Sequence, residues 1–188
     1  AADPQAAVNS NRIVALADGV SHILDDPNCL DYFKAAIVTF PAISVLESRM
    51  TPADPVALFN ARLAFEAALA RQLHGHYQAA LDPKKSAQLA DTAGGRALLN
   101  RLLALAVAAG DAQADERAMA HVLDSNMTVS QGALAAVNNR PTVVRESVLS
   151  AFHDRWQDNA LVLEKWFSFE SMSCISGRIE RLQELMQH

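Results

Sequence analysis

The stretch that decides the fold covers residues 154–169, DRWQDNALVLEKWFSF, and holds both tryptophans of the chain. A polar corner, QDN, separates Trp156 from an apolar run that contains Trp166. Asp158 or Asn159 suits the first position of a new helix, because a short polar side chain accepts a backbone N–H there. The spacing predicts two helices that fold back on each other at this corner, with one tryptophan on each arm.

The rest of the chain shows the same helical spacing, and no segment alternates apolar and polar residues as a strand would. Abundant alanine and only 7 glycines among 188 residues also favour helices. Short connections make neighbouring helices antiparallel. The sequence therefore predicts an all-α fold, in which residues 1–188 form a single helical domain. About ten antiparallel helices would make an irregular array of superhelix or bundle type, without the fixed period of a regular solenoid.

One long helix is predicted near the middle of the chain. Asp54 suits a helix cap and Pro55 suits the first helical position. Apolar residues then recur every three or four positions until Pro83, which predicts one helix of about 26 residues. Gly110 is predicted to stop the helix that covers residues 96–109.

Two short motifs predict capping boxes, in which residues three apart satisfy each other's backbone N–H groups. Ser44 with Glu47 would open a brief helix, and Thr128 with Gln131 would open another just after Asn126.

The two ends of the chain also carry helical stripes. The first helix, capped by Ser10, would bury Ile13, Leu16 and Val20 on one side. The last stripe consists of Ile175, Ile179, Leu182 and Met186.

Composition argues against several classes of protein. The net charge is −5 and no basic block exceeds two residues, which argues against nucleic-acid binding. No apolar run approaches the roughly 20 residues of a membrane helix. Cys29 and Cys174 lack C-x-x-C spacing, so two buried thiols in a reducing, cytoplasmic compartment are expected. The start, AADPQ, lacks Met and a signal peptide and is interpreted as a cut or processed end.

Motifs for metal or nucleophilic chemistry are missing from the sequence. It has no H-E-x-x-H, G-x-S-x-G, P-loop or G-x-G-x-x-G pattern. His74 and His76 are two apart and point to different helix faces, and His22 with Asp26 lacks a third ligand. The glycine pair before residue 96 could approach a phosphate, but no Lys-Ser/Thr follows it. Whether the chain is an enzyme stays open.

Glu170 is the one weak candidate for a functional side chain, as a buried carboxylate. A helical wheel places it on the same apolar arc as Trp166 and Phe167, while Glu164 and Lys165 fall outside that arc. It could be a general acid, or a carboxylate bonded to an arginine or to backbone donors. The second interpretation is favoured because no second catalytic group is identifiable nearby.

Five segments, taken in order, resemble landmarks of the C-terminal helical domain of the bacterial aminopeptidase N family, zinc-dependent aminopeptidases of the gluzincin type. The most specific are Asn126-Met127-Thr128 and residues 155–167, and the first forty residues and LDPKKSAQLADTAG fit poorly. The segments are VTFPAISVLESRM, DPVALFNARLAFEAALARQL, GRALLNRLLALAV, NMTVSQGALAAV and FHDRWQDNALVLEKWFSFESMS.

The resemblance implies a larger, multi-domain parent. In that family an earlier domain carries H-E-x-x-H and the zinc, and the helical domain closes a chamber over the active site. Arginines that reach the chamber come from a segment expected beyond His188, so the chain is interpreted as a fragment. No catalytic, cofactor or metal residue carries over, and Trp156, Trp166, Phe167, Asn126 and Thr128 are expected to be structural.

The expected partners are therefore the catalytic and other domains of the parent polypeptide, with peptide substrates met only indirectly. The alternative is a free-standing helical scaffold that binds a partner protein in a groove. An enzyme that uses Glu170 ranks third.

Overall fold

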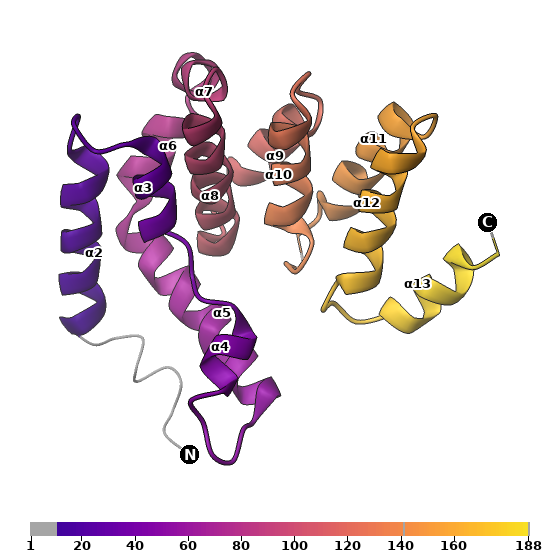
Figure 1. The fold of residues 1–188 in the computed structure, drawn as a ribbon, viewed down its shortest axis with the longest axis horizontal. Helices are drawn as coiled ribbons and strands as arrows, with labels where there is room; N and C mark the ends of the chain where they lie inside the picture. The colour runs from indigo at the N-terminus through magenta and orange to yellow at the C-terminus, as the bar shows by residue number, and fades with distance from the viewer. Residues whose placement is uncertain (1–10, 141, 188) are drawn as a thin grey trace. The chain divides into compact units, whose positions relative to one another are not determined.

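The computed structural model describes residues 11–140 and 142–187 (Figure 1). Within these ranges it contains twelve α-helices and no strand, which confirms the all-α prediction. The helices vary from 5 to 18 residues, and this unequal length explains the lack of a fixed repeat period. The chain divides into two compact units, the first ending at Gly110 and the second beginning at Asp111.

The first unit is built around α8. α3, α5, α6 and α7 pack against it, and its leucines at 98, 99, 102, 103 and 105 are all buried. Gly110 ends α8 with φ 69°, a left-handed conformation that glycine adopts without strain, as predicted. The described helices of this unit are α2 (Asn11–Asp25), α3 (Asp31–Ile37), α4 (Ile43–Glu47), α5 (Pro55–Gln72), α6 (His74–Leu81), α7 (Pro83–Ala90) and α8 (Ala93–Ala109).

The single long helix predicted after Asp54 is wrong. Asp54 caps α5 as expected, accepting the N–H of Ala57 at 2.9 Å, but the helix ends at Gln72. Leu73 leaves the helical conformation and is fully buried, as Tyr77 is one turn later. Since α5 and α6 both contact α8, the break turns the chain so that both segments cover the same core helix.

A helix that the sequence analysis did not predict, α7, begins at Pro83, which was expected only to end a helix. Asp82 caps it by accepting the N–H groups of Lys84 and Lys85. Gly95, in the first turn of α8, has a packing role, because a Cβ there would lie 2.0 Å from the carbonyl oxygen of Leu89.

Two predictions near the start of the described chain need correction. In α2, Ile13 and Val20 are buried as expected, but Ala17 fills the position between them and Leu16 is exposed. The first capping box is wrong because α4 begins at Ile43, which places Ser44 inside the helix. The predicted cap at Ser10 lies outside the described residues.

The second unit buries one face of each of its first four helices. Its described helices are α9 (Ala114–Val122), α10 (Met127–Val137), α11 (Arg145–Trp156), α12 (Ala160–Met172) and α13 (Arg178–Leu185). The cap of α10 is Asn126, whose Oδ1 accepts the N–H of Thr128 at 2.9 Å. The predicted capping box is therefore wrong, because Thr128 already lies in the first helical turn.

Candidate functional site

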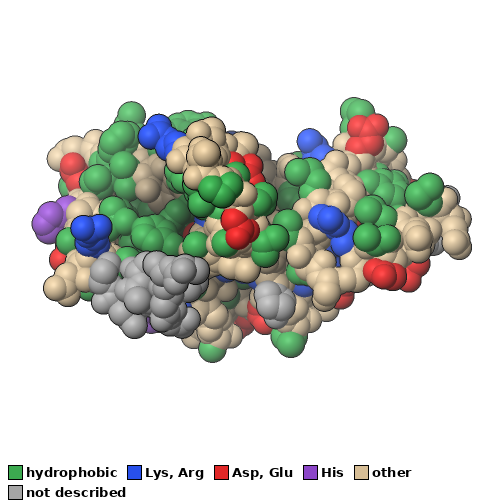
Figure 2. All heavy atoms as spheres, turned by 90° about the horizontal axis from the view of Figure 1, so that it is seen from below, with side chains coloured by type: hydrophobic (Ala, Val, Ile, Leu, Met, Phe, Trp, Pro, Cys, Tyr) green, Lys and Arg blue, Asp and Glu red, His purple; other side chains and the backbone are tan. Residues whose placement is uncertain are grey.

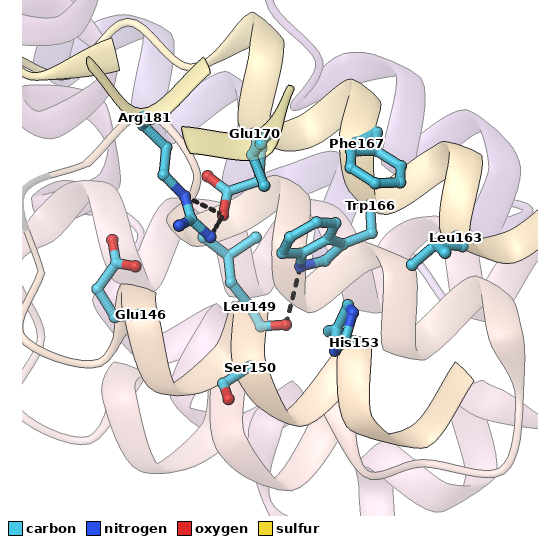
Figure 3. Close-up of a pocket in the computed structure, with 10 residues that line it drawn as sticks. Glu146, Leu149, Ser150, His153, Leu163, Trp166, Phe167, Glu170 and Arg181 are labelled. Carbon is cyan, nitrogen blue, oxygen red and sulfur yellow. Dashed lines mark hydrogen bonds and ion pairs between the residues drawn. The ribbon is translucent and has the colours of Figure 1, made fainter. Parts of the chain in front are cut away.

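The corner predicted from the sequence joins α11 and α12 in the second unit. Asn159 caps α12 by accepting the N–H of Val162 at 3.3 Å. The two helices run antiparallel, because Arg145 at the start of α11 pairs with Glu170 near the end of α12. At the middle, the indole Nε1 of Trp166 donates a hydrogen bond of 3.0 Å to the carbonyl oxygen of Leu149 (Figure 3).

The aromatic side chains at this joint differ in burial. Trp166 is buried and contacts the rings of His153 and Phe167, with centroids 4.8 Å and 5.1 Å away. Phe167 lies on the edge of the apolar arc and is 38% exposed. Trp156 is half-buried at the end of α11, with the guanidinium of Arg155 5.4 Å from its ring.

Glu170 is almost completely buried and pairs with two arginines from different helices. Arg181 of α13 donates from Nη2 at 2.9 Å and from Nε at 3.2 Å to one carboxylate oxygen. Arg145 of α11 lies 3.5 Å from the other oxygen. The hydrogen bond to Glu170 raises the pKa of Arg181 above its usual value. Burial acts in the opposite direction but has a smaller effect.

The buried guanidinium of Arg145 connects Glu170 to the end of α10. Its Nε donates to the backbone oxygen of Asn138 at 3.1 Å, and its Nη2 donates to Oδ1 of the same residue at 3.2 Å. Asn138 in turn donates to the carbonyl oxygen of Phe169 at 2.8 Å and accepts from the hydroxyl of Ser173. We call these side chains, with Glu170 and Arg181, the Glu170 network.

This arrangement suits structure better than acid catalysis. Both carboxylate oxygens of Glu170 accept hydrogen bonds from guanidinium groups, which join α12 to α11 and α13. Sequence reasoning anticipated an arginine partner but did not identify Arg145 or Arg181.

A groove lies on the surface beside Trp166, between α11 and α12, with α13 at one end (Figure 3). Its volume is about 560 Å³, and we call it the α11–α12 groove. Lys165 lies outside it and lines a separate hollow of about 450 Å³ next to α10. The groove is lined by Glu146, Leu149, Ser150, His153, Leu163, Trp166, Phe167, Glu170, Arg181 and Leu185.

The remaining polar candidates do not line this groove. In the first unit, Nε2 of His76 lies 3.2 Å from Asp25, and the ring of His74 contacts Tyr77. Among the described residues, no three His, Cys, Asp or Glu side chains are grouped so that they could hold a metal ion. The described residues therefore do not provide a set of ligands for the zinc ion that the resemblance implies for the parent protein.

The sequence analysis predicted two buried cysteines, and this prediction is wrong. Cys29 is half-buried and Cys174 is exposed, and both are free thiols. In the described part of the chain, no helix is both long and apolar enough to cross a membrane.

The fold and the Glu170 network define an all-helical domain whose buried polar groups join helices to one another. Over residues 4–188 the chain matches the family described as "Domain of unknown function (DUF3458_C) ARM repeats", and it belongs to this family. ARM repeats stack helices on one another, as the structure does within each unit.

Curated relatives agree with the resemblance seen in the sequence. The chain is 32% identical over 180 residues to aminopeptidase N of Caulobacter vibrioides, covering 92% of this chain and 20% of that protein. It is 27% identical over 186 residues to aminopeptidase N of Escherichia coli, covering 93% of this chain and 21% of that protein. The chain thus spans about one fifth of the length of these relatives. The resemblance to the helical domain of aminopeptidase N is confirmed.

A solved structure shares the fold. The crystal structure of Legionella pneumophila aminopeptidase A in complex with aspartic acid superimposes with a TM-score of 0.73. The match covers 94% of this chain and 24% of that chain at 18% sequence identity.

Proposed function

We propose that the chain is the non-catalytic, C-terminal helical domain of a zinc-dependent aminopeptidase N-like enzyme, which removes N-terminal amino acids from peptides. The domain would shape and close the chamber over the active site. The observation that carries this proposal is the alignment of 92% of the chain with one fifth of an aminopeptidase N.

The chemistry would then belong to another domain. A catalytic domain of the parent polypeptide would hold the zinc, as the similarity to aminopeptidase N suggests. Its catalytic and other domains are the partners that we infer, and peptides would meet the helical domain only as a chamber wall. Two free thiols are compatible with a cytoplasmic location.

Two measurements test the proposal. The isolated chain, with or without added zinc, should not hydrolyse aminoacyl-anilides. An antibody raised against the chain should detect a native polypeptide well above 20.3 kDa. Activity that co-purifies with the chain and disappears in a Glu170→Gln variant would contradict the proposal.

A second candidate function is a free-standing helical scaffold that binds a partner protein. The α11–α12 groove favours it, because several of its lining side chains are apolar, as in grooves that receive a partner's helix. A native polypeptide of about 20.3 kDa would favour this alternative.

A further inference from the structure

The hollow that Lys165 lines is built from two neighbouring stripes of side chains in the second unit, and we call it the α10–α12 hollow. Gln131 and Ala135 lie one turn apart on α10, and Lys165 and Phe169 lie one turn apart on α12. The two helices are joined at one end of the hollow, where Nδ2 of Asn138 donates a hydrogen bond of 2.8 Å to the carbonyl oxygen of Phe169. The hollow thus lies between two helices whose ends are held together by a hydrogen bond.

Lys165 has no counter-ion in the described part of the chain. None of the ion pairs there includes it, and α10 carries no charged residue between Met127 and Val137. The two carboxylates of α12, Glu164 and Glu170, do not line the hollow. The described residues that line it therefore include one cation and no carboxylate.

Two side-chain amides on the α10 side can also donate hydrogen bonds to a bound molecule. Gln131 is half-buried, and its amide makes no hydrogen bond to any other described residue. Oδ1 of Asn139 accepts the backbone N–H of Cys174 at 2.8 Å, which leaves Nδ2 as the available group. A carboxylate accepts hydrogen bonds from both ammonium and amide donors, so it matches the polar part of this lining.

The remaining lining is mainly apolar. It includes Ala135, the half-buried ring of Phe169 and the side chain of Met172, which is 71% exposed. An apolar group placed against Phe169 and Met172 would remove their exposed surface from water. The complementary molecule therefore carries an apolar group beside its negative charge.

We propose that the α10–α12 hollow binds a carboxylate that carries an apolar group, either the C-terminal residue of a peptide or a free N-acylated amino acid. The carboxylate pairs with Lys165 and accepts a hydrogen bond from the amide of Gln131. The apolar group packs against Phe169 and Met172. This site goes beyond the proposed function and does not depend on the aminopeptidase assignment.

The test compares two fluorescent molecules that differ only in charge, dansyl-leucine and dansyl-leucinamide. The whole chain should bind the acid about tenfold more tightly than the neutral amide, because only the acid can form charge-assisted hydrogen bonds. Since Lys165 is exposed, raising the salt from about 0.05 M to about 0.5 M should weaken binding of the acid but not of the amide.

A first pair of variants tests the charge. Lys165→Met keeps most of the aliphatic side chain but removes the ammonium group, so the acid should then bind no more tightly than the amide. Lys85→Met removes the charge of an exposed lysine in α7 and should leave binding unchanged. Both variants should keep the unfolding midpoint of the wild-type chain, because both side chains are exposed.

A second pair of variants tests the apolar contact. Met172→Ser should weaken binding of both the acid and the amide, because the methionine packs against their shared leucine side chain. Leu161→Ser removes a side chain of α12 that is 74% exposed and does not line the hollow, so it should not change binding.

Competition against dansyl-leucine distinguishes the two sources of the carboxylate. N-acetyl-leucine and a synthetic peptide of eight residues that ends in leucine should both displace it. Stronger competition by the peptide identifies a C-terminal residue as the ligand, and stronger competition by N-acetyl-leucine identifies the free acid. The same peptide with an amidated C-terminus should compete about tenfold less well.

Three results would overturn the proposal. The first is equal affinity for dansyl-leucine and dansyl-leucinamide, which would indicate apolar adsorption alone. The second is unchanged binding of the acid by a folded Lys165→Met variant. The third is absence of binding of dansyl-leucine, N-acetyl-leucine and the peptide to the folded wild-type chain.

Discussion

Trp166 connects the two arms of the corner through both packing and a hydrogen bond. It is 6% exposed, and its indole N–H is satisfied by the carbonyl oxygen of Leu149. We expect Trp166→Ala to destabilise the chain by ~3–5 kcal/mol, because it leaves a cavity and removes the hydrogen bond between the two helices. Lys165→Ala, on the exposed side of the same helix, should cost under about 1 kcal/mol. Urea unfolding measures both, and equal small losses would show that the joint is not part of the core.

His121 should make the stability of the second unit depend on pH. Burial lowers the pKa of His121 below its usual 6.5, with Arg117 acting in the same direction and Asp124 opposing it. A lowered pKa in the folded state favours the neutral ring there. The contribution to stability is therefore complete above about 6.5 and is lost as the pH falls through the folded value.

Unfolding measured between pH 5 and pH 7.5 tests this expectation. His121→Gln, which cannot titrate, should flatten the pH dependence, whereas His153→Gln at the edge of the groove serves as a control. A steeper loss of stability at low pH in His121→Gln would contradict the assignment.

Single residues show where sequence reasoning reaches its limit. The interpretation of Glu170 as a carboxylate paired with arginine agrees with the structure. The partners were not identified, because they lie 25 and 11 positions away on other helices. Helical periodicity relates residues within one helix and carries no information about which helices meet.

At the scale of helices, α7 and α8 approach each other closely at Gly95, which lies at the start of α8 against the backbone of Leu89 in α7. A Cβ on Gly95 would overlap the carbonyl oxygen of Leu89, so Gly95→Ala must push the two helices apart. We expect a loss of ~1–3 kcal/mol, as for other overpacked sites. Gly19→Ala, at an open and exposed position within α2, should instead stabilise the chain by up to about 1 kcal/mol. Thermal unfolding of both variants gives the comparison, and a neutral Gly95→Ala would contradict the close approach.

Helix ends were predicted correctly where nearby residues determine them. They were predicted wrongly where packing against other helices determines them. Asp54, Asn159 and Gly110 act at helix ends as expected, because each acts on its own backbone. The only local signal for the break at Leu73 is Gly75, and the apolar spacing continues across it. It follows from the position of α8, which only the folded chain defines.

At the scale of the whole molecule, the fold class follows from composition and spacing, but the function does not. The resemblance to aminopeptidase N rested on the order of its motifs and not on any catalytic side chain. What the structure adds is a set of surfaces. Figure 2 shows hydrophobic side chains at several places on one face of the molecule.

Large apolar side chains are also exposed on α3 and on the residue before it. Leu30, Phe33 and Ile37 share one side of this segment and are 76%, 53% and 37% exposed, whereas Ala35 and Val38 are buried. Contiguous apolar surface of this kind marks sites that are covered by another protein or domain. If the α3 face is covered in the parent enzyme, the isolated chain should expose it.

We therefore expect the isolated chain to associate as its concentration rises, which light scattering will detect as an increase in mean mass. Phe33→Lys places a charge in the middle of the exposed α3 face and should reduce this association without changing stability by more than about 0.5 kcal/mol. Ile179→Lys is the matched substitution on α13, and a reduction only in that variant would assign the contact to the last helix instead. A chain that stays monomeric at all concentrations would show that neither face needs a cover, which would weaken the case that it is one domain of a larger enzyme.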